Sequence, residues 1–168
     1  MIQPQVSGLV TKLHSDMTLG GIVKAQAPLL EIDKNDYRLA VRQAQAQVGQ
    51  ATVRLREEEG RQAVAAHEWD LLRKDQGAEQ DPPAGKSLAL REPQLKSAQL
   101  NLEAARASLA QSKLALKRTS LTAPMNGVIL RKTVDAGQRV APNQSVATLV
   151  GTDRWWIQVS LSPSVSVE

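Results

Sequence analysis

Hydrophobic and polar positions divide the chain into three zones. Residues 1–33 and the residues from about 120 onward carry short alternating apolar runs rich in Val, Ile, Thr and Gly, a pattern typical of β-strands. Residues 34–119 are rich in Ala, Gln, Glu, Arg and Leu, which favour helix. The pattern therefore predicts an α+β chain in which one long helical zone separates two β zones.

Within the helical zone, apolar residues recur with the period of a coiled coil. In the second half, one leucine returns at every seventh position, and in the first half larger apolar residues alternate with alanines at spacings of four and three. Such a repeat predicts a buried seam between two helices. The predicted seam residues are Leu88, Leu95, Leu102, Leu109, Leu116, Val41, Val48 and Leu55.

A firm break separates the two halves of the seam. The segment QGAEQDPPAGKS at about 76–87 contains two Gly and two adjacent Pro, which end a helix. Two helices joined by a short loop pack antiparallel, so the zone predicts a long α-helical hairpin with its tip at this segment. Pro93 lies near the start of the second helix and predicts either a bend or a helix that begins at Glu92.

The two β zones repeat one pattern of apolar residues. Gly-x-x-Val is followed in both zones by an apolar residue six positions on and another three positions later. Each half is too small to bury its own face, so residues 1–33 and 120–153 are expected to fold together into one discontinuous β-sandwich. Asn126-Gly127 predicts a tight turn in the second copy. The matching residues are Gly20, Val23, Leu29 and Ile32 in the first copy and Gly137, Val140, Val146 and Leu149 in the second.

Composition and charge exclude several classes of function. The net charge is only +4 and cysteine is absent, which excludes a disulfide scaffold, a thiol nucleophile and a Cys-ligated metal site. The leucine repeat is not preceded by the basic cluster of a DNA-binding zipper, so no nucleic-acid partner is expected. His14 and His67 lack the spacing of metal ligands, and no catalytic triad, phosphate loop or carboxylate pair is present. The sequence predicts neither an enzyme nor a bound metal or cofactor.

Five strings, in this order, resemble one family along the whole chain. VSGLV, GGIVK and LLEIDKNDYRLAV stand in the first β zone and the hairpin entry, SLALREPQL begins the second helix, and LKRTSLTAPMNGVI spans the hairpin exit. Together they resemble the periplasmic adaptor proteins, or membrane fusion proteins, of HlyD type that serve RND efflux pumps.

The resemblance implies an architecture and a role. The hairpin would be inserted between the halves of a lipoyl/biotinyl-like β-sandwich, and residues 154–168 would be the first strand of a truncated β-barrel domain. The protein would bridge an inner-membrane RND transporter to a TolC-like outer-membrane channel in the periplasm, as a ring of copies. The chain shows no signal-peptide pattern and no apolar run long enough to span a membrane, so its signal and anchor are expected to be missing.

The resemblance also places contacts with the outer-membrane channel at the hairpin tip. The Arg, Leu and Ser pattern of many RND adaptors is absent here, because Glu68 and Glu79 stand around Leu72 where Arg and Ser would be expected. The predicted tip contacts are Leu72, Arg73, Lys74, Asp75, Glu79, Asp81 and Ser87.

Two alternatives remain open from the residues. An adaptor for a type I secretion system or another ABC exporter would have the same architecture with a different pump. A lipoyl or biotinyl carrier domain of an enzyme complex would need a modified lysine, for which Lys24 and Lys132 are the candidates in the β zones.

Overall fold

A computed structural model describes residues 1–76 and 87–154, with the backbone alone for residues 73–76. The chain divides into two compact units: a β unit built from the residues up to Asp33 and from Arg118 onward, and a helical unit of Lys34–Lys117. The predicted barrel strand at 154–168 lies outside the described residues, apart from Arg154.

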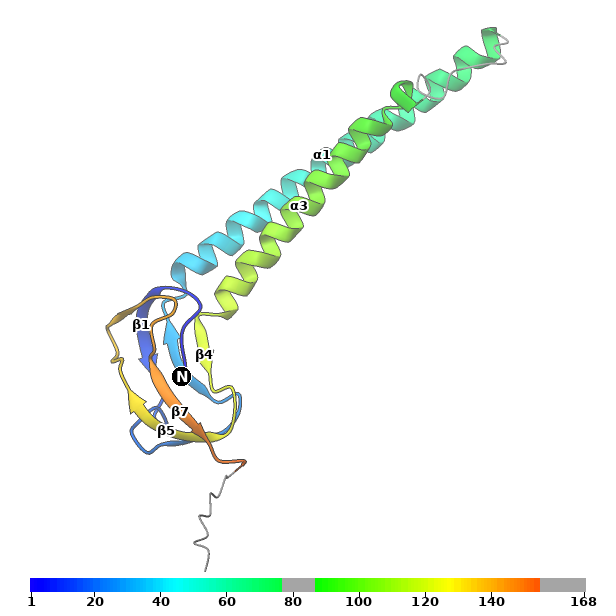
Figure 1. Ribbon diagram of the computed structural model, residues 1–168. Helices are drawn as coiled ribbons and strands as arrows, with labels where there is room; N and C mark the ends of the chain where they lie inside the picture. Colours follow the sequence, from blue (N-terminus) through cyan, green and yellow to red (C-terminus); the bar gives the residue numbers. More distant parts are fainter. Residues whose placement is uncertain (77–86, 155–168) are drawn as a thin grey trace, which may run out of the picture. The chain divides into compact units, whose positions relative to one another are not determined.

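The elements, drawn in Figure 1, are β1 (Gly8–Leu13), β2 (Ile22–Val23), β3 (Pro28–Ile32), α1 (Asn35–Gln76), α3 (Glu92–Lys117), β4 (Ser120–Thr122), β5 (Gly127–Lys132), β6 (Arg139–Val140) and β7 (Ala147–Gly151).

Both sheets of the β unit combine strands from before and after the helices. A four-stranded sheet has the order β4-β3-β1-β6, and a three-stranded sheet has the order β2-β5-β7, with every pairing antiparallel. Side chains from both sheets share one buried core, in which Val10, Leu29 and Ile129 are at most 1% exposed. Segments distant in sequence therefore form one fold, because neither has enough apolar surface alone.

The two copies of the repeat occupy equivalent places in this unit. Gly20 and Gly137 both have positive φ, 77° and 86°, a conformation that glycine adopts without steric cost. The Gly20 N–H donates to the Ile129 carbonyl, and the Gly137 N–H donates to the Val10 carbonyl, both at 2.8 Å. Each copy thus supplies the hydrogen-bond partner of the other, while the positive φ accounts for a glycine at this place in both copies.

The predicted tight turn at Asn126-Gly127 is wrong in its geometry. Residues 123–126 carry the chain from β4 in one sheet to β5 in the other, so they do not close a hairpin. The Asn126 Oδ1 accepts from the Ala25 N–H at 2.8 Å, and its Nδ2 donates to Asp153 at 3.0 Å. Gly127 is needed for close approach, because an added Cβ would lie 2.2 Å from the Val150 carbonyl oxygen.

In the described part of the helical unit, two long antiparallel helices, α1 and α3, contact each other side by side (Figure 1). α1 has 42 residues and α3 has 26, so α1 is roughly 60 Å long at 1.5 Å per residue. α3 begins at Glu92, which is one of the two outcomes that Pro93 allows, since proline is tolerated in the first turn of a helix. We call α1, α3 and the helical residues 87–89 the helix pair.

Candidate functional site

Small and aliphatic side chains form the inner line of the helix pair. On α1, Ala44 and Ala51 are buried, and on α3 Leu102 is 6% exposed. The remaining predicted seam residues of the two helices are half-buried: Val41, Val48, Leu55, Leu95, Leu109 and Leu116. An interface of only two helices leaves part of each side chain in contact with water.

Leu88 does not continue this line, because its side chain is 63% exposed. The backbone of Arg91 has a φ of +56°, which interrupts the helix between residues 87–89 and α3. The seven-residue repeat of leucines therefore holds within α3 only. Counting it back across the break places Leu88 in the seam, and that prediction is wrong.

A carboxylate stands within the inner line of α1. Glu58 is 8% exposed and occupies a position that the four-three spacing assigns to the seam. The Arg91 Nε–H donates to the Glu58 Oε1 at 2.6 Å, and an Arg61 N–H donates to the Oε2 at 3.4 Å. Burial of a charge is costly unless it is paired, and here both carboxylate oxygens have a cationic partner.

The ion pair shifts the pKa of both groups and favours their charged forms. The hydrogen bond from Arg91 lowers the pKa of the Glu58 carboxyl, and the same contact raises the pKa of Arg91. Because the carboxyl pKa is lowered in the folded state, the contribution of the pair to stability is present at neutral pH. That contribution is lost as the pH falls through the lowered pKa.

An open groove of about 830 Å³ lies beside this ion pair. Gly60, Val64 and Ala65 of α1 line one part of it, and Leu88 and Ala89 line another. Glu57 and Glu68 also line it, so it combines an apolar surface with exposed charge near the outer end of the helix pair.

The predicted tip contacts are only partly described. Leu72 is 54% exposed, and the half-buried Ser87 donates through its Oγ to the Glu92 Oε2 at 2.6 Å. Arg73, Lys74 and Asp75 lie on the last turns of α1, since that helix extends to Gln76. Glu79 and Asp81 lie outside the described residues.

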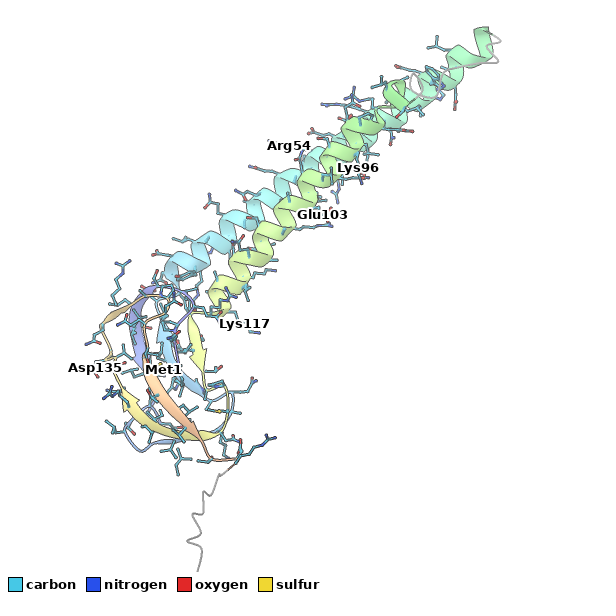
Figure 2. All side chains as sticks on the ribbon, in the orientation of Figure 1. Met1, Arg54, Lys96, Glu103, Lys117 and Asp135 are labelled. Atoms are coloured by element: carbon cyan, nitrogen blue, oxygen red, sulfur yellow. The ribbon has the colours of Figure 1, made fainter. Side chains whose placement is uncertain are left out.

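Charged side chains project from the helix pair along its length, as Figure 2 shows for Arg54 on α1 and for Lys96, Glu103 and Lys117 on α3. The described part of the chain contains no group of three His, Asp or Glu side chains that could hold a metal ion. Nor does it contain a helix long and apolar enough to cross a bilayer.

Comparison with known proteins decides the family. Residues 1–152 match the model of the RND MFP barrel-sandwich hybrid domain, where MFP denotes a membrane fusion protein. The chain belongs to this family of periplasmic adaptors. The multidrug resistance protein MdtA of Escherichia coli K12 is 26% identical over 151 residues. That alignment covers 90% of the chain and 34% of MdtA, so the chain spans about a third of this relative.

Solved structures of membrane fusion proteins have the same fold. A MacA–MexA chimera that contains the Pseudomonas aeruginosa MexA α-hairpin domain has a TM-score of 0.59 and 25% identity, covering 89% of this chain and 46% of the chimera. The periplasmic adaptor protein EmrA has a TM-score of 0.61 at 15% identity, with 89% of this chain and 71% of EmrA covered. The barrel-sandwich hybrid fold is therefore established, and the family consists of structural, non-enzymatic proteins.

Proposed function

We propose that this membrane fusion protein is the periplasmic adaptor of a tripartite RND efflux pump. It would connect an inner-membrane RND transporter to a TolC-like outer-membrane channel and promote the efflux of drugs or other small molecules. The observation that carries the proposal is the match of residues 1–152 to a domain of RND adaptors. The name of the relative MdtA, a multidrug resistance protein, supports the choice of substrates.

The mechanism would be mechanical. Copies would pack through their β units into a ring, and the helix pairs would form a sheath around the conduit. Because α1 is roughly 60 Å long, residues 72–88 would be the part that reaches the channel. The surface charges there would set the geometry of docking, with little effect on folding, since exposed ion pairs contribute little to stability.

Charge reversal at the outer end of α1 tests this role. Arg73→Glu with Lys74→Glu, placed in the full-length protein, is expected to leave expression and transporter association intact but to abolish most cross-linking to the channel. Drug susceptibility should rise toward that of a strain without the adaptor, because repulsion replaces the docking contact. The measurements are site-specific cross-linking and minimal inhibitory concentrations.

A matched control lies on the same helix. Arg54→Glu with Arg56→Glu makes the same change at two exposed positions closer to the start of α1, and we expect channel cross-linking to be retained. Wild-type cross-linking and susceptibility for the Arg73/Lys74 variant would refute docking through this end of the helix.

A further inference from the structure

The helix is interrupted at Arg91 by a strained backbone conformation, and the residue is half-buried. A positive φ of 56° is uncommon for a residue with a Cβ, and such conformations persist only where surrounding contacts enforce them. The Arg91 N–H donates to the Leu88 carbonyl at 3.1 Å, and its own carbonyl accepts from the Leu95 N–H at 3.0 Å. The backbone of Arg91 thus joins the turn at residues 88–91 to the first turn of α3.

The side chain of the same residue is held by the other helix. The contact from the Arg91 Nε to the Glu58 Oε1, at 2.6 Å, spans 33 residues of sequence. Glu58 has a relative exposure of only 8%, so its carboxylate depends on this partner much more than a surface carboxylate would. Arg61 also pairs with Glu58, at 3.4 Å, but it belongs to α1 itself. It therefore cannot hold residues 87–90 against α1.

Apolar packing holds the turn only in part, since Ala89 and Leu90 are half-buried but Leu88 is exposed. Leu88 is 63% exposed, and the groove between this turn and α1 is open, with Gly60 offering no side chain toward it. Pro93 favours a helix start nearby but leaves the direction of the preceding turn unspecified. An ionic contact with defined geometry can fix the direction of this turn even where it adds little stability.

We propose that Glu58 and Arg91 are positioning residues that restrain the helix break at Arg91 and hold residues 87–90 against α1. Cutting the contact should release this turn and leave the rest of the helix pair folded. The inference concerns the helix pair itself and is tested without any pump. For docking, the restraint would fix the direction of the chain where it joins the predicted channel contacts at residues 72–88. This consequence rests on the function proposed above.

Amide hydrogen exchange of Glu58→Leu, followed by NMR at single residues, tests the restraint. Leucine suits the seam, and the half-buried Arg91 side chain can reach water once its partner is removed, so the melting temperature should change little. The amides of Arg91 and Leu95 should nevertheless exchange about 10-fold faster or more, because a charged hydrogen bond that held the turn is lost. A residue that only stabilised the fold would instead lower the melting temperature and speed exchange throughout α3.

Two further variants make the result unambiguous. Gln62→Leu places the same side chain at the next polar seam position, which is half-buried, and should leave exchange at Arg91 and Leu95 unchanged. Arg91→Gly relieves the backbone strain but removes the cation, and should accelerate exchange at Leu95. The proposal is overturned if Glu58→Leu leaves both amides at the wild-type rate, or if Gln62→Leu accelerates them equally.

Discussion

Replacing Ile129 with alanine is expected to destabilise the β unit by about 2–5 kcal/mol, the range for removing most of a buried aliphatic side chain. Ile129 is 0% exposed, and its carbonyl accepts the hydrogen bond from Gly20 of the other repeat copy. A cavity at this point therefore weakens the junction between the two halves. Denaturant-dependent hydrogen exchange, resolved by peptide, separates the β unit from the helix pair.

The adjacent residue is a matched control. Leu130 is 56% exposed, so Leu130→Ala should change the free energy of unfolding by no more than about 0.5 kcal/mol. Equal destabilisation by the two substitutions would contradict the assignment of Ile129 to a core shared by both sheets.

Leu102→Ala is expected to lower the stability of the helix pair by about 2 kcal/mol, the low end for a buried leucine, because two helices enclose it incompletely. Leu102 is 6% exposed and lies at the centre of the predicted seam. Thermal unfolding followed by circular dichroism at 222 nm reports mainly on α1 and α3.

Leu100 is the comparison for that substitution, since it lies two residues away and is 52% exposed. Leu100→Ala should lower the melting temperature less than Leu102→Ala does. The reverse order would mean that the seven-residue line of leucines does not mark the interface.

The repeat in the β zones could be predicted from the sequence, because single positions in it require a particular residue type. A glycine at positive φ and a buried valine three residues later leave a spacing that recurs, as Gly20-x-x-Val23 and Gly137-x-x-Val140 show. The reciprocal hydrogen bonds between the copies left no such trace, since backbone groups carry no sequence signal. Gln26 also has a positive φ, 69°, although glutamine is not a residue type that signals this conformation.

The outer end of the helix pair was harder to predict. The leucine heptad extends to Leu88 in the sequence, whereas the backbone departs from it at Arg91, and Pro93 was the only local sign of that change. Glu58 interrupts the apolar seam in the sequence. On α3, Ala98 and Ala105 lie seven residues apart, and Arg91 stands seven residues before Ala98, so the period places a cation on the inner line of α3. Periodicity identifies which positions face inward but cannot say which charges meet there.

The direct test of the adaptor function is cross-linking of the full-length protein in living cells, followed by mass spectrometry of the captured partners. We expect an inner-membrane RND transporter and a TolC-like channel in the same complexes, together with further copies of the adaptor. Capture of an ABC exporter without an RND transporter would contradict the proposed pump. A lipoylated or biotinylated Lys24 or Lys132, with an enzyme complex as partner, would contradict the adaptor function altogether.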